Sequence, residues 1–359
     1  YEYAIGTSSG GTDVVNWADN STDITVTRTD LTLTNGTAYY VSVRSTDNVG
    51  NVSTVVSTDG ITIDVTSPVI SGVIEGSLTA DMDYQNIASQ LIISWTGSDG
   101  GSGISMYEYT LGTSTGATDA ITWTSAGTDT AATLTGLSLT EGTTYYLSVR
   151  ATDVAGNMSS VSSADGITID LTAPAGTTVN DGTGEDIAYT GSDSTLSANW
   201  PAFTETVSGI SKYEVAIGTT SGGTDVVDWI DNSTDTSVTK TGLTLNSGTY
   251  YTSVKTKDNA GNESTTITSD GVTVDTAAPV AGNVVDGTDT DIDWTNSTNI
   301  LTATWSGFSD ALSGIQKYEY AIGTSSGGTD VVNWADNSTD ITVTRTDLTL
   351  TNGTAYYVS

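Results

Sequence analysis

Apolar and polar residues alternate along much of the chain. Leu196, Ala198 and Trp200 are separated by single polar residues, and the apolar positions of residues 213–217 are spaced in the same way. Side chains on a strand point alternately to its two faces, so this period of two predicts strands with one buried face. We expect further strands after Pro174 and at residues 226–229, 236–238, 243–245, 250–254 and 272–274. About seven strands in about 105 residues, with no helical spacing, predict a β-sandwich.

This pattern is part of a long internal repeat. The string YEYAIGT at Tyr1 returns as YEYTLGT at Tyr107, YEVAIGT at Tyr213 and YEYAIGT at Tyr318, at intervals of 106, 106 and 105 residues. The first 42 residues are identical to the last 42. A fixed period of this length predicts a linear array of similar domains. The identity over three periods indicates a duplicated three-domain unit, so we expect the sequence to be a window from a longer array.

Short segments that end in proline divide the array. They read IDVTSP, IDLTAP and VDTAAP, and they end at Pro68, Pro174 and Pro279. Proline restricts the residue before it to extended conformations, so these segments are typical of short, stiff linkers. We place the repeats at residues 1–65, 66–171, 172–276 and 277–359. The first and the last are expected to be partial, with strands C to G and strands A to F.

Aromatic residues recur at fixed places in each repeat. The second strand carries a Trp and the third carries Ile-x-x-Tyr, at Trp95/Tyr107, Trp200/Tyr213 and Trp305/Tyr318. With the segment LTLTNGTAYYVSVR of residues 31–44, this pattern resembles fibronectin type III domains. The best match is the tandem fibronectin-like or immunoglobulin-like repeats of giant bacterial surface proteins. The resemblance implies an all-β linear array of seven-stranded sandwiches with the Trp and Tyr in the core. It also implies tyrosine corners at Tyr39, Tyr145, Tyr250 and Tyr356.

The charge of the chain narrows its possible functions. There are 9 Lys+Arg against 43 Asp+Glu, a net charge of −34, with no His and no Cys. Such a chain repels nucleic acid and attracts cations, and it lacks disulfides, thiolate nucleophiles and the commonest general base. No run of 18 apolar residues and no basic-then-apolar leader occurs, so we expect no membrane span or signal peptide in these residues. Because every acidic motif recurs in each repeat, we expect no enzymatic activity.

Acidic residues recur in three sets that point to a metal. One set leads an acid-x-x-Ser-Gly-Ile turn after the second strand, another leads an Asp-x-x-Gly-Asn turn after the sixth, and the third lies in the linkers. Both turns belong at the end of the sandwich where the linker arrives, so the acids should converge. Without basic partners they repel one another unless a cation bridges them, and Ca²⁺ accepts six to eight oxygens. The candidate ligands are Asp64, Asp99, Asp153, Asn157, Asp170, Glu205, Asp258, Asn262, Asp275 and Asp310.

A plainer interpretation stays open for these acids. Asp and Asn cap the backbone of turns, and an acidic surface keeps a long array soluble. At the other end of each repeat, the turn after the first strand adds Glu75, Asp181 and Asp286, which could face the next domain.

Two aromatic sets also have alternative interpretations. Trp17, Trp123, Trp229 and Trp334 could stack on sugars, although packing against a neighbouring strand or domain is the commoner role. Tyr40, Tyr146, Tyr251 and Tyr357 are expected on a sheet face, where they could make lateral contacts.

Together with the resemblance to repeats of bacterial surface proteins, these observations predict an extended rod or stalk of an extracellular bacterial surface adhesin or fibre. Its partners would be the neighbouring repeats of the same chain, and Ca²⁺ at the joints would limit bending. Two alternatives remain: a self-assembling filament or sheath built by lateral contacts between repeats, and a carbohydrate-binding array that uses the recurrent Trp.

Overall fold

Strands and the turns between them make up the regular secondary structure. The computed structural model describes residues 1–359 and contains no helix, so the all-β prediction is confirmed. The structure has no helix of the length and apolar character needed to cross a membrane. The residues form two compact units, Tyr1–Ala173 with Glu205–Gly209 and Asp258–Asn262, and Pro174–Thr204 with Ile210–Lys257 and Glu263–Ser359. The repeat boundaries drawn from the sequence stay a prediction.

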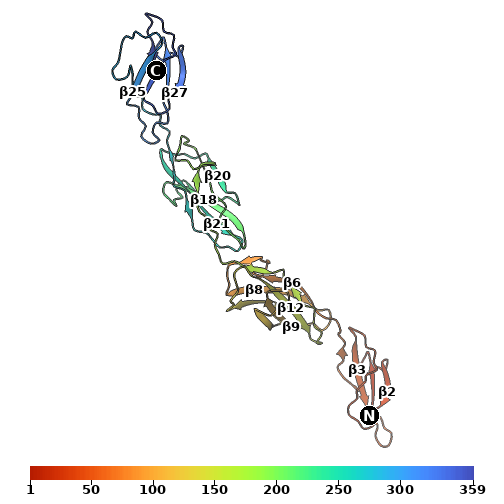
Figure 1. The fold of residues 1–359 in the computed structure, drawn as a ribbon. Coiled ribbons are helices and arrows are strands. Elements are labelled where there is room, and N and C mark those ends of the chain that lie inside the picture. The colour runs from red at the N-terminus through yellow and green to blue at the C-terminus, as the bar shows by residue number, and fades with distance from the viewer. The chain divides into compact units, whose positions relative to one another are not determined.

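The second repeat is a sandwich of two sheets, whose strands are seen in Figure 1. One sheet has the order β11-β8-β6, and the other has the order β10-β9-β12-β14-β7, with β13 also paired to β12. The strands are β6 (Val69–Glu75), β7 (Tyr84–Gln85), β8 (Gln90–Ser98), β9 (Ile104–Gly112), β10 (Ile121–Gly127), β11 (Ala131–Thr135), β12 (Thr144–Asp153), β13 (Ser162–Ser163) and β14 (Ile167–Ile169). Pairing is antiparallel except between β14 and β7.

The core of the second repeat lies between these sheets. Leu91, Ile93 and Trp95 alternate along β8 and are buried, as the period of two predicts. The Trp95 and Tyr107 rings are in contact, with centroids 5.9 Å apart. Burying such side chains is the main favourable term in folding, about 25 cal/mol for each Å² of apolar surface.

The third repeat has the same two sheets. Their orders are β15-β17-β20 and β16-β23-β21-β18-β19, with β22 also paired to β21. The strands are β15 (Asn180–Asp181), β16 (Tyr189–Thr190), β17 (Thr195–Asn199), β18 (Ile210–Gly218), β19 (Val227–Asp231), β20 (Ser237–Thr241), β21 (Gly248–Asp258), β22 (Ile267–Thr268) and β23 (Val272–Val274). The predicted strand at 243–245 is wrong. The amides of Leu243 and Leu245 donate to the carbonyls of Ser194 and Asp193, so the segment is an irregular loop whose Leu side chains fill the core.

The first and fourth repeats show parts of the same pattern. The first has one sheet, in the order β2-β1-β3-β4 with β5 paired to β3, and the fourth has β24-β25-β28 and β27-β26-β29. The strands are β1 (Glu2–Gly6), β2 (Val15–Asp19), β3 (Ala38–Arg44), β4 (Val56–Ser57), β5 (Ile61–Thr62), β24 (Asn283–Asp286), β25 (Leu301–Ser306), β26 (Glu319–Gly323), β27 (Val332–Asp336), β28 (Thr342–Arg345) and β29 (Tyr357–Val358).

The predicted tyrosine corners are present in all four repeats. The hydroxyl of Tyr250 accepts a hydrogen bond from the Asn246 amide and donates one to the Asn246 carbonyl, both at 3.0 Å. The hydroxyls of Tyr39, Tyr145 and Tyr356 each accept from the backbone amide five residues earlier. In the third repeat this hydrogen bond spans four residues instead of five, because the repeat lacks one residue before Tyr250.

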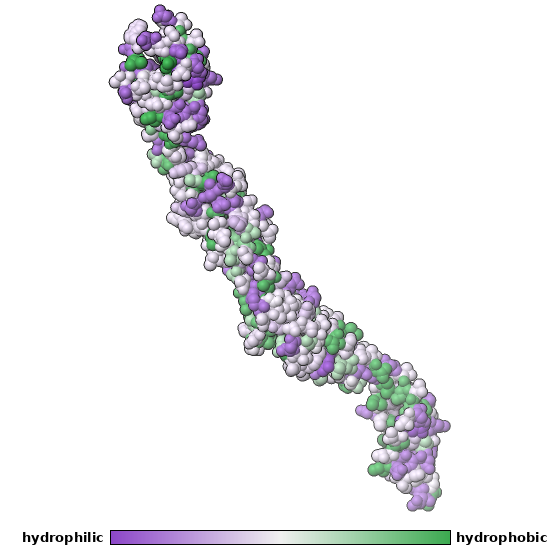
Figure 2. Space-filling model, in the orientation of Figure 1, coloured by the Kyte–Doolittle hydropathy of each residue, from purple (hydrophilic) through white to green (hydrophobic).

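The visible surface is of mixed polarity. Figure 2 is largely white, the colour of intermediate hydropathy, with hydrophilic and hydrophobic residues scattered among the white ones. This agrees with a sequence rich in Ser, Thr and Gly and with only 14% charged residues.

Candidate cation sites

The amide, the carbonyl and the carboxylate of Asp170 are all hydrogen-bonded. It directly follows β14, and its side chain is fully buried, with 0% exposure. Its amide donates to the Gln85 carbonyl at 2.9 Å, while its Oδ2 accepts from the Ser208 amide at 3.1 Å. Its carbonyl accepts from Nδ2 of Asn262 at 2.9 Å. The linker residue is therefore held by both of the turns that the sequence predicted to meet it.

Asp258 and Asn262 close the second of these turns. Oδ1 of Asp258 accepts from the Asn262 amide, and its Oδ2 accepts from Nδ2 of Asn262, both at 2.8 Å. Asp258 is only 2% exposed. In the other turn, Oε1 of Glu205 accepts from the Val207 amide at 2.7 Å. One carboxylate oxygen from each of Asp170, Glu205 and Asp258 lies within 4.8 Å of the others, which is close enough for one cation to bridge them.

Asp64, Asp99 and Asp153 form the equivalent group in the second repeat. One carboxylate oxygen from each again lies within 4.8 Å of the others. Nδ2 of Asn157 donates to the Asp64 carbonyl at 3.0 Å and to Oδ2 of Asp153 at 2.8 Å. A hydrogen bond from the Ser102 hydroxyl, followed by the Thr66 amide, holds the pKa of Asp64 below its usual value. Oδ1 of Asp99 is buried and has no hydrogen-bond partner.

Asp275 and Asp310 do not belong to a group of three carboxylates. They share the backbone amide of Ser313, at 3.1 Å from Oδ2 of Asp275 and 2.8 Å from Oδ1 of Asp310. Hydrogen bonds from the amides of Gly314, Leu312 and Ser313 lower the pKa of Asp310. The predicted convergence of linker and turn acids thus holds for two complete groups and one pair. Metal binding by these residues stays a prediction, because the same oxygens also accept backbone hydrogen bonds, as the turn-capping interpretation expects.

Two of the three acids at the other end of the repeats, Glu75 and Asp181, are not placed to face a following domain, whereas Asp286 is only half-buried. Glu75 and Asp181 do not face a following domain, because both are fully buried, at 0% exposure, within their own repeats. The reason is that the loop after each acid turns back: the Glu75 amide donates to Oδ1 of Asp81, and the Asp181 amide donates to Oδ1 of Asp186. Asp181, Asp186 and Asp270 form a third group of carboxylate oxygens within 4.8 Å of one another.

Sequence reasoning missed Asp186 and Asp270. The available signal was the recurrence of an Asp-Gly turn before the last strand, at Asp59, Asp165 and Asp270, together with an acid five or six residues after the first strand. Nothing in the linear sequence indicated that these two positions meet.

Basic side chains cover the half-buried Trp residues. The guanidinium carbon of Arg44 lies 4.2 Å from the Trp17 ring centroid, and that of Arg150 lies 4.3 Å from the Trp123 centroid. Nζ of Lys255 lies 4.9 Å from the Trp229 centroid. At these distances cation–π attraction stabilises the pair. One face of each of these three rings is therefore already occupied within the repeat, which favours the packing role over sugar stacking for them, whereas Trp334 is 54% exposed.

In the first three repeats, the second Tyr of each pair packs on a glycine. The backbone of Gly271 has φ +101, and a Cβ atom there would meet the Tyr251 ring at 2.7 Å. Gly166 lies against Tyr146 and Gly60 against Tyr40 in the same way. These three rings are half-buried, so much of their surface is used inside the repeat rather than left for lateral contacts.

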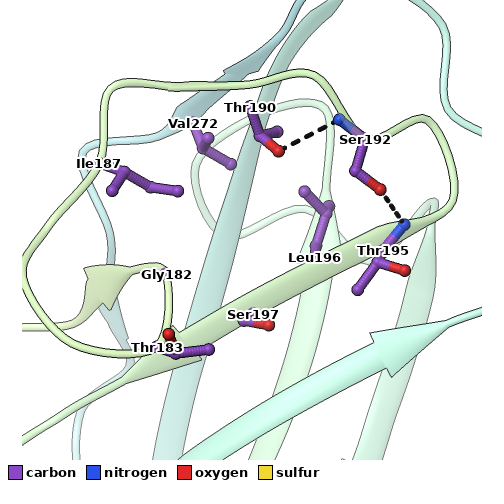
Figure 3. Close-up of a pocket in the computed structure, with 9 residues that line it drawn as sticks. All are labelled: Gly182, Thr183, Ile187, Thr190, Ser192, Thr195, Leu196, Ser197 and Val272. Carbon is purple, nitrogen blue, oxygen red and sulfur yellow. Dashed lines mark hydrogen bonds between the residues drawn. The ribbon is translucent and has the colours of Figure 1, made fainter.

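A cavity of about 210 Å³ lies in the third repeat (Figure 3). It is lined in part by Gly182 and Ile187, the residues that follow Asp181 and Asp186 in the sequence. Oγ1 of Thr190 accepts from the Ser192 amide at 3.2 Å, and Oγ of Ser192 accepts from the Thr195 amide at 3.0 Å. None of the residues that line it carries a charged side chain.

The chain is similar to parts of two curated proteins. Exoglucanase B of Cellulomonas fimi is 34% identical over 271 residues, which cover 73% of this chain and 22% of that protein. Chitinase A1 of Niallia circulans is 37% identical over 153 residues, which cover 42% of this chain and 20% of that protein. The chain thus spans about a fifth of the length of the curated relatives it matches. None of the known protein-family profiles matches it.

Solved structures with several tandem domains also align with the chain. The FN1–FN3 domains of chicken CNTN1 align with a TM-score of 0.34 at 16% identity, covering 76% of this chain and 91% of that one. A titin segment aligns with a TM-score of 0.38 at 15% identity, covering 66% and 74%. The strand orders of the second and third repeats themselves establish the two-sheet sandwich.

Proposed function

We propose that this chain, a tandem array of fibronectin type III-like β-sandwich repeats, is a structural spacer of an extracellular bacterial surface protein. It would form a stalk that holds a functional domain away from the cell. The observation that supports this most is the way Asp170, a linker residue, is bound by the turns at Ser208 and Asn262. Asp64 is bound in the same way by Ser102 and Asn157.

These contacts give the proposed stalk its stiffness. A flexible linker would leave its backbone groups to water, whereas the amide, carbonyl and carboxylate of Asp170 are all hydrogen-bonded. A repeated joint of this kind stabilises each repeat through its immediate neighbours only. Such an array can therefore lengthen by duplication without new kinds of contact.

Ca²⁺ at the joints would strengthen this arrangement. Asp170, Glu205 and Asp258 bring three carboxylates together, and a divalent cation would replace their mutual repulsion by attraction. Asn262 uses its amide nitrogen as a donor, so its side-chain oxygen remains available as a further ligand. The same description applies to Asp64, Asp99, Asp153 and Asn157.

A second candidate function follows from the two relatives. Their names describe an exoglucanase and a chitinase, so the same array would serve as a spacer within a secreted enzyme that degrades polysaccharides. In that case a catalytic domain would lie elsewhere in the protein. We expect no catalytic activity from the residues described here. The filament and the sugar-binding array remain alternatives. The scattering experiment below tests the filament, and a titration with polysaccharide tests the sugar-binding array.

Small-angle X-ray scattering of the 359-residue chain tests the spacer and its joints. We expect a constant mass with rising concentration and a larger maximum dimension in millimolar Ca²⁺ than in chelator. Asp258→Asn should remove most of the Ca²⁺ effect, whereas Asp193→Asn, an exposed acid whose side chain makes no hydrogen bond, should retain it. Equal profiles with and without Ca²⁺ would reject the calcium joint, and a mass that rises with concentration would favour the filament. Quenching of Trp fluorescence by a polysaccharide would favour the sugar-binding array.

A further inference from the structure

We propose that the third repeat carries a second Ca²⁺ site, distinct from the joints, with Asp181, Asp186 and Asp270 as its protein ligands. Asp181 ends β15, Asp186 lies in the loop that follows, and Asp270 lies in the turn between β22 and β23. One carboxylate oxygen from each lies within 4.8 Å of the others.

Local hydrogen bonds hold the three acids in this arrangement. The amide of Asp181 donates to Oδ1 of Asp186 at 2.7 Å, which folds the intervening loop back on the strand end. The amide of Gly271 donates to Oδ2 of Asp181 at 3.1 Å, which ties the turn of Asp270 to the same carboxylate. Segments about 90 residues apart in the sequence are therefore joined at Asp181.

One carboxylate oxygen at this site has no hydrogen-bond partner. Asp181 is fully buried, at 0% exposure, and its Oδ1 has no hydrogen-bond partner. A buried polar atom without a partner costs about 1 to 3 kcal/mol, so folded proteins rarely leave one. None of the ion pairs of this repeat involves Asp181, Asp186 or Asp270, because they are made by Glu214, Asp231 and Glu263. A cation beside Asp181 would satisfy both the oxygen and the repulsion among the carboxylates.

In the second repeat, the buried acid at the equivalent position also has an oxygen without a hydrogen-bond partner. Glu75 is also fully buried, and its Oε1 has no partner. Its amide donates to Oδ1 of Asp81 at 3.0 Å, as Asp181 does to Asp186.

The two repeats differ in a way that preserves the acid. In the third repeat, Oγ of Ser269 accepts from the Thr252 amide at 3.0 Å, so the shorter Asp181 need not reach that amide. In the second repeat Ala164 replaces this Ser, and the longer Glu75 accepts from the Leu147 amide at 3.3 Å. The second repeat thus has no Ser hydroxyl here and has Glu in place of Asp. In both repeats the buried acid keeps one oxygen without a hydrogen-bond partner.

The donor set fits Ca²⁺. It contains oxygen atoms only, which hard cations prefer, and no imidazole or thiolate is available in this sequence. Asp186 and Asp270 are exposed, so water can complete the six to eight ligands that Ca²⁺ takes, and the ion can reach the buried Asp181 from solvent.

Backbone NMR of the full chain tests this site separately from the joints. We expect a Ca²⁺ titration of the metal-free chain to shift the amide signals of Asp181 and Gly271 below a few millimolar Ca²⁺, the range of extracellular modules. Asp270→Asn should weaken this response by at least tenfold. Asp270 is exposed and its side chain makes no hydrogen bond within the protein, so this variant should fold normally. The matched control is Asp193→Asn, which should titrate like the unchanged chain.

The amides of Ser208 and Asn262 report on the joint instead. Their response should be unaffected by Asp270→Asn, so failure of one site is distinguishable from failure of the other. If the Asp181 and Gly271 signals do not move with Ca²⁺, or if they move equally in Asp270→Asn, the inference is wrong. Signals that follow pH but not Ca²⁺ would also overturn it, because the buried acid would then hold a proton instead of the ion.

Discussion

Asn262 donates a hydrogen bond from its side-chain amide to the backbone carbonyl of Asp170, 92 residues earlier in the chain, at 2.9 Å. Asn157 and Asp64 repeat this relationship at 3.0 Å, across 93 residues. In both cases the same nitrogen also donates to the Asp that begins the turn. One Asn side chain therefore connects the linker to the turn through two hydrogen bonds.

Asn262→Ala should loosen the joint at Asp170. It removes the donor to two oxygens, one of which belongs to Asp258, a buried acid. Loss of a partner for a buried polar group costs about 1 to 3 kcal/mol, so the free energy of local opening should fall by that amount. Native-state hydrogen exchange at the Ser208 amide, which donates to Asp170, would measure it.

The matched control for this variant is Asn246→Ala, because the Asn246 side chain is exposed and makes no hydrogen bond. Its Ser208 amide should exchange at the rate of the unchanged chain. Equal protection of Ser208 in Asn262→Ala and in the control would show that the joint is held by other contacts.

Tyr250→Phe should destabilise the third repeat. The variant leaves the Asn246 amide and carbonyl, both at 3.0 Å from the hydroxyl, without a partner in a part-buried setting. We expect a loss of about 1 kcal/mol in the opening free energy of β21, measured by hydrogen exchange of its amides. Tyr251→Phe on the same strand is the control, since the Tyr251 ring packs on Gly271 and its hydroxyl makes no hydrogen bond. Equal losses in the two variants would contradict a specific role for the corner.

In the presence of chelator, the free energy of unfolding of the second repeat should fall as the pH rises, because of Glu75. Burial raises its pKa from 4.5 to about 8 in the folded chain, with the Asp81 and Asp165 carboxylates adding to the increase. Between these values the folded state holds a proton that the unfolded state has released. The unfolding free energy therefore falls with pH up to about 8, by at most about 1.4 kcal/mol per unit, and is level above it.

Glu75→Gln should remove this dependence. The measurement is hydrogen exchange of the β12 amides in the variant and in the unchanged chain, compared at the same pH from 6 to 8.5. The sequence has no His, so few other groups titrate in this range. The variant should be the more stable chain at pH 8.5 and should lose that advantage toward pH 6. A difference that does not vary with pH would show that Glu75 is not protonated in the folded state.

The features that could be predicted from the sequence are those that follow from local residue patterns or from the topology of the fold. Burial of Trp95 and Tyr107 follows from the period of two, and the corner at Tyr250 follows from the resemblance. The approach of Asp170 to Asp258 could be predicted because turns at one end of a sandwich must lie near the arriving linker.

Other features depend on contacts that no linear pattern specifies. The burial of Asp181 results from the loop that returns to Asp186, and its approach to Asp270 results from strand pairing across about 90 residues. The apolar alternation of Leu243 and Leu245 was misleading, because an irregular loop can place the same two side chains in the core when its amides find carbonyls elsewhere. Periodicity reports which side chains are buried, and it does not report how the backbone is hydrogen-bonded.

Arg150→Ala should weaken the edge of the second repeat where β10 pairs with β9. Arg150 covers the Trp123 ring at 4.3 Å, and its Nε contacts Oε2 of Glu108 at 2.8 Å. A half-exposed cation–π contact contributes about 0.5 to 1 kcal/mol, and a surface ion pair contributes less than about 1 kcal/mol. We therefore expect about 1 kcal/mol less protection of the β10 amides in hydrogen exchange.

Substitution by lysine provides the decisive comparison for this contact. The third repeat places Lys255 over Trp229 and pairs it with Glu214, so Arg150→Lys should keep most of the protection that Arg150→Ala loses. Lys240→Ala, which removes a positive charge that takes part in no ion pair, should leave β10 unchanged. If Arg150→Ala and Arg150→Lys lose protection equally, the planar guanidinium and not its charge stabilises the Trp123 edge. If neither loses any, the Trp faces are not held by cations, and sugar stacking on them regains support.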